Sequence, residues 1–456
     1  MAQDVATTAN RVVMDSTFWI ATAIFIIAYA VIASEKIHKT IVALVGGGLV
    51  LLMKILEQQE AFHSEDLGID WNVIFLLISM MIIINLMKPT GIFEYIAIKS
   101  AKAGKGDPFR ILVIFGIVTA TVSAFLDNVT TVLLITPVTI LIADALEVDV
   151  IPFLISNALS SNIGGTATLI GDPPNIMIAS KAHLDFMAFI YHLTPVIIII
   201  MVCYVFMIKL FWGKTLKTRE ELKQRIFAMD ERASIKDPVM VRKSLVVLTI
   251  VIIGFVFHGM LHFQPATIAL CGAALLLLLS KTQEPHHILA DVEWSSIFFF
   301  MGLFIIIGGI VKVGLITWMS VQVLKFTQGN LFATSMVVMW FSAFASAVID
   351  NIPYVATMNP LVIDMARQLW PNLSGAQLLQ QPDLMPIWWS LSLGACLGGN
   401  GTAIGASANV IVVGISEKMG KKVSFMKFML YGMPIMLMTV AVSTVYVWLR
   451  YYVFNI

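Results

Sequence analysis

Three aspartates interrupt long apolar runs in this chain, in which 59% of the 456 residues are hydrophobic. Asp127 and Asp350 each precede an asparagine, Asn128 and Asn351, and the numbering of the two Asp-Asn pairs differs by a constant offset of 223. Asp172 stands between a glycine and two prolines. An ionised carboxylate at membrane depth costs at least about 2.5–3.5 kcal/mol on insertion scales, so it usually faces a cavity, an ion or a partner. We therefore expect these aspartates to couple transport to protons or cations.

Competition between a proton and a metal cation for one carboxylate is the physical basis of cation/proton antiport. A structural alternative stays open, because Asp is a favoured N-cap and Asp127 and Asp350 could each begin a helical arm. The equivalent positions of the two aspartates in the repeat favour a functional role, although a structural N-cap would be duplicated as well. Asp172 has no counterpart, since Ala406 occupies the matching position. It is either a third ionisable ligand or a residue of an Asx-Pro turn.

Polar uncharged residues accompany the aspartates. Small hard cations prefer oxygen ligands from carbonyls, amides and carboxylates, whereas helix N-termini would favour an anion. The alternative is that these side chains only satisfy freed backbone groups. No nucleophile–base arrangement or nucleotide fingerprint is present, so we predict no enzyme, no catalytic residue, no metal site and no cofactor. The predicted substrate or ion ligands are Asn128, Thr130, Gly165, Thr168, Asn175, Asn351, Asn400, Thr402, Ser407 and Asn409.

The segment 161–175, SNIGGTATLIGDPPN, has three glycines and two prolines inside an apolar run. Gly and Pro disfavour continuous helix, and a bilayer tolerates broken backbone only inside protein or along a wet cavity. Such breaks are where transporters bind their ligands. Residues 164–175 align with 398–409 at a constant offset of 234, and six of the twelve positions are identical. The sequence therefore predicts a repeated, interrupted membrane helix.

The elements around these motifs are apolar helices. Only 12% of the residues are charged, far fewer than in soluble domains. We predict an all-α polytopic membrane protein of two inverted repeats, each with about five transmembrane helices, a re-entrant hairpin and a broken helix. The predicted boundaries are 1–211 for the first repeat (hairpin 111–146, broken helix 152–180), 212–243 for a charged linker, and 244–456 for the second repeat (hairpin about 331–370, broken helix about 386–416).

The distribution of Lys and Arg predicts the orientation. The linker 212–243 has nine basic and five acidic residues, so we expect it in the cytoplasm and both termini outside. The location is then the cytoplasmic membrane, with the lipid bilayer as a partner. A net charge of +1 and the lack of a basic stripe exclude nucleic acid as a partner.

The motifs resemble those of one transporter group. SAFLDNVTTVLLITPVTI and NIGGTATLIGDPPNI, with GACLGGNGTAIGASANV in the second half, are similar to the ArsB/NhaD/P-protein group of the ion transporter superfamily. The resemblance implies a scaffold, a mobile unit that moves as an elevator, and a homodimer; an ArsB-like permease would add a separate ATPase. Related sodium/dicarboxylate symporters have Ser-Asn-Thr at the hairpin tips, where this chain has Asp127-Asn128-Val129-Thr130 and Asp350-Asn351-Ile352-Pro353.

Aspartate in place of the leading serine disfavours a dicarboxylate, because two added negative charges would repel a dianion. We predict a proton-coupled antiporter or efflux permease for a small inorganic ion or oxyacid, either arsenite/antimonite or Na+/Li+. The coupling ions would be H+ and, in one version, Na+. The alternatives are a sodium-coupled, citrate-like di- or tricarboxylate symporter and an anion conductance of the P-protein type.

Overall fold

The computed structural model describes residues 12–280 and 285–455, and all regular elements in them are helical. The prediction of an all-α polytopic membrane protein is confirmed. The helices of the first half are α2 (Ser16–Ser34), α3 (Lys39–Leu52), α4 (Gln58–His63), α5 (Trp71–Met87), η1 (Lys88–Thr90), α6 (Ile92–Ala103), α7 (Pro108–Ser123), α8 (Asn128–Ala145), α9 (Ile151–Gly165), α10 (Pro173–Ala182), α11 (Phe186–His192) and α12 (Thr194–Trp212). The linker holds α13 (Glu220–Ala228) and η2 (Arg232–Ser234).

The second half has a matching series of helices. It consists of α14 (Pro238–Leu261), α15 (Pro265–Ser280), α16 (Pro285–Ala290), α17 (Trp294–Lys312), α18 (Leu315–Phe326), α19 (Leu331–Val348), α20 (Asn351–Leu369), α21 (Gly375–Leu379), α22 (Met385–Gly398), η3 (Gly399–Gly401), α23 (Ser407–Lys418), α24 (Phe425–Val447) and the π-helical turn η4 (Trp448–Val453). Among the described residues, eight helices are long and apolar enough to cross a membrane, and four shorter apolar helices accompany them.

The helix boundaries repeat along the chain. The first residues of α6, α7 and α8 match those of α18, α19 and α20 at the offset of 223, and the first residue of α10 matches that of α23 at the offset of 234. The agreement reflects duplicated local signals. For example, Gly91 and Gly314 each stand directly before a helix, and both have φ near +85°, a conformation that favours glycine. That the halves are inverted, with limits 1–211 and 244–456, stays a prediction; residues 1–11 and 456 lie outside the described part.

Each predicted hairpin is a pair of helices joined by a short turn, α7–α8 and α19–α20. Each is followed by an interrupted helix, which is α9 and α10 with residues 166–172 between them, and α22 and α23 with η3 and residues 402–406 between them. Glycine is needed at the first break, because a Cβ on Gly165 would lie 2.5 Å from the Gly171 carbonyl oxygen. The breaks expose backbone groups inside the protein, where other residues must satisfy them.

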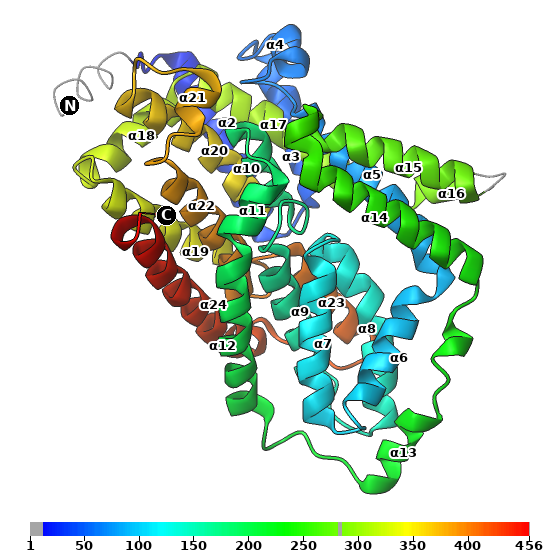
Figure 1. Cartoon of the computed structure of the whole chain (residues 1–456). Helices are drawn as coiled ribbons and strands as arrows, with labels where there is room; N and C mark the ends of the chain where they lie inside the picture. Colours follow the sequence, from blue (N-terminus) through cyan, green and yellow to red (C-terminus); the bar gives the residue numbers. More distant parts are fainter. Residues whose placement is uncertain (1–11, 281–284, 456) are drawn as a thin grey trace.

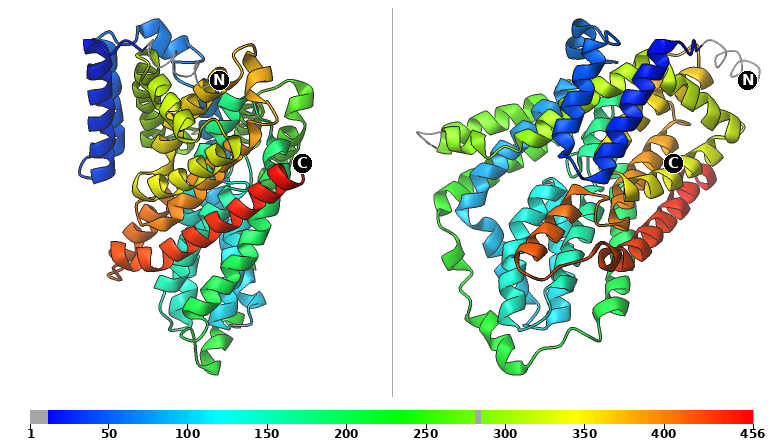
Figure 2. Two further views of the ribbon diagram at one scale, coloured as in Figure 1. Left: turned by 90° about the vertical axis from the view of Figure 1, so that its left-hand side faces the viewer. Right: turned by 180° about the vertical axis from the view of Figure 1, so that it is seen from behind.

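Two sets of helices pack together in space. α3 contacts α17, and α5 contacts α14 and α15, whereas α7 and α8 pack on α9, and α19 packs on α22. Figure 1 shows α7, α8, α9 and α23 gathered together, away from the α5–α14–α15 group. The two views of Figure 2 show α2 and α3 on the outside of the molecule, beside the second-half helices. The hairpins and broken helices therefore form one packed unit, in which α23 contacts α8 and α9.

Candidate functional site

Asp172 lies at the junction of both hairpins. Its side chain is in the break between α9 and α10 and is almost completely buried, at 1% exposure. Asn128, the first residue of α8, donates its amide to Asp172 Oδ1 at 3.3 Å. Asn351, the first residue of α20, donates to Asp172 Oδ2 at 3.2 Å. One carboxylate thus connects three elements that are far apart in the sequence.

A group of asparagines extends this junction. Asn162 on α9 accepts a hydrogen bond from Asn128 at 3.2 Å. Its own amide donates to the side-chain oxygens of Asn400, at 2.9 Å, and Asn409, at 3.0 Å. Sequence reasoning missed Asn162, although it lies in the segment 161–175, just before the repeated glycine motif. Its counterpart in the second half is Cys396, so the repeat did not single it out.

Asn175 and Asn409 occupy matching positions and have matching contacts. Asn175 donates to the carbonyl oxygens of Thr166 and Thr168, at 3.2 and 2.9 Å. Asn409 donates to those of Gly399 and Thr402, at 2.8 and 2.9 Å. These amides satisfy the carbonyls that each helix break frees, which is the structural alternative. The Asn175 oxygen also accepts from Ser392 at 2.6 Å.

Thr168 and Thr402 attach the broken helices to the hairpins. Thr168 donates its hydroxyl to the carbonyl of Ala124, and Thr402 donates to that of Ala347 at 2.5 Å. Ala124 and Ala347 are themselves equivalent residues, just before the two hairpin turns. Both hydroxyl protons are therefore used in backbone contacts, and these threonines position the site. The close approach of Gly165 to Gly171 likewise shapes the backbone of the break.

Asp127 and Asp350 cap helices and also face a cavity. Asp127 accepts the backbone N–H of Thr130 at 2.9 Å and also its hydroxyl. Asp350 accepts the N–H of Ile352 at 3.2 Å. Each aspartate therefore caps its helix, as the structural alternative expects, and also lines the cavity; the coupling role stays a prediction. The cavity, of about 480 Å3, is also lined by Glu35, His38, Lys39, Glu293 and Ser407.

Lys39 is the basic residue that the sequence reasoning missed. Its ammonium nitrogen lies 2.7 Å from Asp350 Oδ2 and 2.9 Å from Ser407 Oγ. Ser407 also donates to Asp350 Oδ2 at 2.9 Å. A lysine at the start of an apolar helix next to a polar loop was the available signal, but it did not identify the partner.

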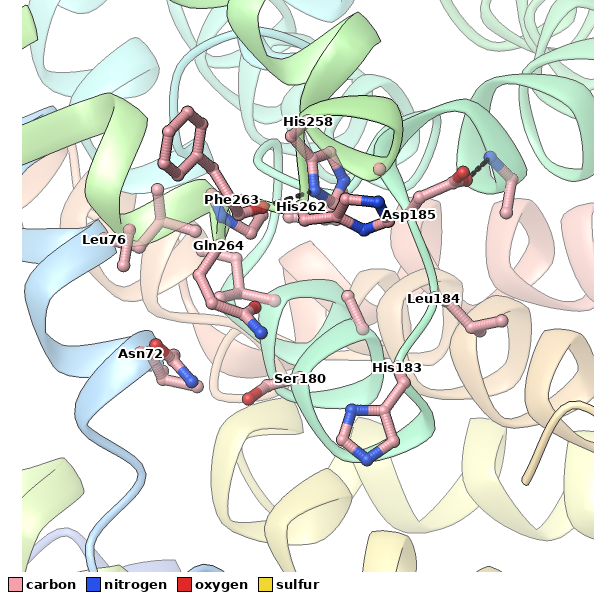
Figure 3. Close-up of a pocket in the computed structure, with 18 of the residues that line it drawn as sticks. Asn72, Leu76, Ser180, His183, Leu184, Asp185, His258, His262, Phe263 and Gln264 are labelled. Atoms are coloured by element: carbon pink, nitrogen blue, oxygen red, sulfur yellow. Dashed lines mark hydrogen bonds between the residues drawn. The ribbon is translucent and has the colours of Figure 1, made fainter. Parts of the chain in front are cut away.

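A second cavity, of about 580 Å3, lies at repeat-related positions. Asn72 and Ile176 line it, and their counterparts Ser295 and Val410 line the first cavity. Figure 3 shows the labelled His258 on α14 and His183 at the end of α10 beside this space. None of the sequence-predicted ligands lines this cavity, and among the described residues no group of three or more His, Cys, Asp or Glu is arranged to hold a metal ion.

The structure therefore divides the predicted residues into three groups. Asp172, Asn128, Asn351, Asn400 and Asn409 meet at the buried junction; Asp127, Thr130, Asp350 and Ser407 lie at or beside the acidic cavity; and Gly165, Thr168, Asn175 and Thr402 shape the broken helices.

Comparison with known proteins gives consistent matches. A family model described as citrate transporter matches residues 29–394. An uncharacterized transporter of Mycobacterium tuberculosis is 42% identical, over 95% of this chain and 99% of its own length. The 46 kDa membrane protein of Mycobacterium leprae is 41% identical, over 96% and 99%. The human P protein is 32% identical over 94% of this chain, which spans 59% of that longer protein.

Proposed function

The chain belongs to the citrate transporter family within the ion transporter superfamily, and on that premise we propose that it is a proton-coupled secondary transporter. Membership makes it a multi-pass membrane transporter. The proposed activity is exchange of H+ for a small inorganic cation such as Na+ or Li+, or for an uncharged oxyacid such as arsenite or antimonite. The observation that carries it is the pair of hairpin aspartates, Asp127 and Asp350, in one cavity.

The charge of that cavity supports a cation or a neutral substrate. Four carboxylates line it, those of Glu35, Asp127, Glu293 and Asp350, against one lysine and one histidine. Two unit charges 4 Å apart interact by about 1 kcal/mol in bulk water and about 4 kcal/mol near a protein surface. A citrate trianion would meet net repulsion of this order, unless cations entered with it. Cations would be attracted and would compete with protons for the same oxygens.

The two cavities support alternating access. α14 begins at the linker, and its far end carries His258 in the last turn and His262 directly after the helix. Both histidines line the second cavity. We propose that the second cavity opens on the membrane side opposite the linker and that the acidic cavity opens on the linker side. The hairpins and broken helices would then move between the two as an elevator. With the linker in the cytoplasm of a microbe, the acidic cavity faces inward and both termini lie outside.

A second candidate is sodium-coupled symport of a carboxylate. It is favoured by the description of the matching family as citrate transporter and by Lys39, whose ammonium could pair with a carboxylate substrate. In this version, Asp127 and Asp350 would hold the sodium ions that neutralise the dianion or trianion. Uptake would then need Na+ and would not need a pH gradient.

Proton flux in proteoliposomes separates these candidates. The full chain is reconstituted with a preset pH gradient, and Na+, Li+, arsenite and citrate are added in turn. Antiport predicts that one of the first three collapses the gradient. Asp127→Asn should reduce this flux at least about tenfold, whereas Asp144→Asn, at an exposed position of α8, should not. Citrate uptake that needs Na+, with no collapse of the pH gradient by Na+, Li+ or arsenite, would replace antiport by carboxylate symport. Unchanged coupled flux in Asp127→Asn would remove that aspartate from the mechanism.

A further inference from the structure

Lys39 makes an ion pair between the α3–α17 helix pair and the second hairpin. Lys39 is the first residue of α3, whereas Asp350 is at the tip of the α19–α20 hairpin and Ser407 begins α23. The three side chains form a triangle, with Lys39 Nζ to Asp350 Oδ2 at 2.7 Å, Lys39 Nζ to Ser407 Oγ at 2.9 Å, and Ser407 Oγ to Asp350 Oδ2 at 2.9 Å. The side chain of Asp350 is only 12% exposed. Its charge is therefore neutralised by a group from another helix.

α3 is closely packed on α17, outside the hairpin that carries Asp350. A Cβ on Gly302 of α17 would lie 2.5 Å from the Ala43 carbonyl group of α3, and a Cβ on Gly47 would lie 3.1 Å from the Gly302 oxygen. Such close backbone approach gives a rigid helix pair. The ammonium of Lys39 also lies 5.1 Å from the centre of the Phe299 ring on α17. Lys39 is thus fixed to the α3–α17 pair and contacts Asp350 from there.

The equivalent aspartate has no such partner. In the first half, the position that matches Ser407 is Pro173, which offers no hydroxyl. Within the part of the chain that the structure describes, Asp127 makes no ion pair with Lys or Arg, and its hydrogen bonds come from Thr130. The two hairpin tips therefore differ: Asp350 already holds a cation, and Asp127 does not.

We propose that Lys39 is a tethered counter-ion that displaces the coupling cation from Asp350 whenever the acidic cavity is open. This inference rests on the proposed function, since it assumes that Asp350 binds a proton or a small metal cation during transport. Movement of the hairpin away from α3 separates the pair, and Asp350 then takes up a cation in place of the ammonium. On return, Lys39 drives that cation off into the cavity. The lysine is a positioning residue that gives cation release a direction.

The other charged groups of the cavity fit this role. Glu35 lies in the α2–α3 loop, His38 directly precedes Lys39, Glu293 precedes α17, and Asp127 lies on the other hairpin tip. Each carboxylate would attract the released cation and keep it near the cavity, and none of them can neutralise Asp350. Among the residues that line the acidic cavity, Lys39 supplies the ammonium group that contacts the Asp350 carboxylate.

Cation-dependent thermal stability of the purified full chain tests the inference without transport. Melting midpoints are measured in NaCl or LiCl against choline chloride at constant ionic strength, and across a pH series for H+. Lys39→Met should lower the apparent dissociation constant for at least one of Na+, Li+ and H+ about tenfold, because an internal competitor that occupies the site about nine-tenths of the time is removed. Adding Asp350→Asn to Lys39→Met should abolish that gain. Lys36→Met, which removes an exposed charge from the same loop, should behave as wild type.

A purely structural pair gives the opposite pattern. Lys39→Met would then lower the melting midpoint in every salt, the double variant would restore it, and the dependence on Na+ and Li+ would not change; this result overturns the inference. Lys39→Gln is the second variant if Lys39→Met does not fold. The proton-flux assay keeps the two proposals separate. A shifted cation dependence without coupled flux supports Lys39 and rejects antiport, whereas coupled flux without any shift rejects only the role of Lys39.

Discussion

Asp172→Asn is the substitution that most directly tests the buried junction. The aspartate offers two acceptor oxygens to two amide donors, Asn128 at 3.3 Å and Asn351 at 3.2 Å. An asparagine keeps one acceptor oxygen and places a donor NH2 group against the other amide. One hydrogen bond to a charged acceptor is worth about 1.5–3 kcal/mol, and an unpaired buried donor costs about 1–3 kcal/mol. Because the observed distances are long, we take the low end and expect a loss of about 2 kcal/mol.

The assay is a double-mutant cycle on unfolding in detergent, followed by tryptophan fluorescence. The swap Asp172→Asn with Asn351→Asp restores a donor–acceptor pair across the junction, so it should recover at least about half of the loss. Asp144→Asn, at an exposed position of α8, is the control for removing one carboxylate. An Asp172→Asn variant that loses no more stability than this exposed control would refute the assigned hydrogen bonds, and so would a swap no better than the sum of its single substitutions.

Two further predictions concern the ion pair outside the membrane and helix packing. The hydrogen bond from Lys312 lowers the pKa of Glu60 below its ordinary value of 4.5. The stability from this pair is therefore present above pH 4.5 and lost as pH falls through the lowered pKa. Melting midpoints from about pH 3 to 7 should show a smaller loss in Lys312→Met than in wild type, because the backbone hydrogen bond from Glu57 remains. A Cβ on Gly164 would lie 2.0 Å from the Ala120 carbonyl oxygen, so Gly164→Ala should destabilise the protein by about 3 kcal/mol or more. Gly414→Ala is the control and should not destabilise it, because a Cβ there has no atom within 4 Å. Equal melting midpoints for the two variants would contradict the close packing of Gly164 on Ala120.

The sequence predicts the helices well because their boundaries are set locally. Asp127 and Asp350 cap α8 and α20, prolines begin α7 and α10, and glycines interrupt the broken helices. Each signal acts within a few residues, so a pattern of residue types contains it. Duplication strengthened the inference, because the same signals occur again at a fixed separation. The hairpin turns and both breaks could be located for this reason.

The partners within the site could not be predicted, because they depend on contacts between distant segments. Asn351 meets Asp172 from the opposite half of the chain, and Lys39 of α3 meets Asp350 of the second hairpin. The repeat alone could not separate ligands from side chains that satisfy the backbone. Asn175 and Asn409 match across the halves, and both turn back onto carbonyls of their own broken helix. The asparagine recurs in both halves because each broken helix has freed carbonyl groups that need a hydrogen-bond donor.

The unmatched positions are where the chemistry of the two halves must differ. A single carboxylate, Asp172, accepts hydrogen bonds from both hairpin tips, so both halves share one acceptor. A second aspartate at the matching position, Ala406, would put another negative charge at a fully buried position. A junction that two repeats share needs one acceptor, and a second buried carboxylate would add its own desolvation cost; this is a physical reason for Asp172 and Ala406 to differ.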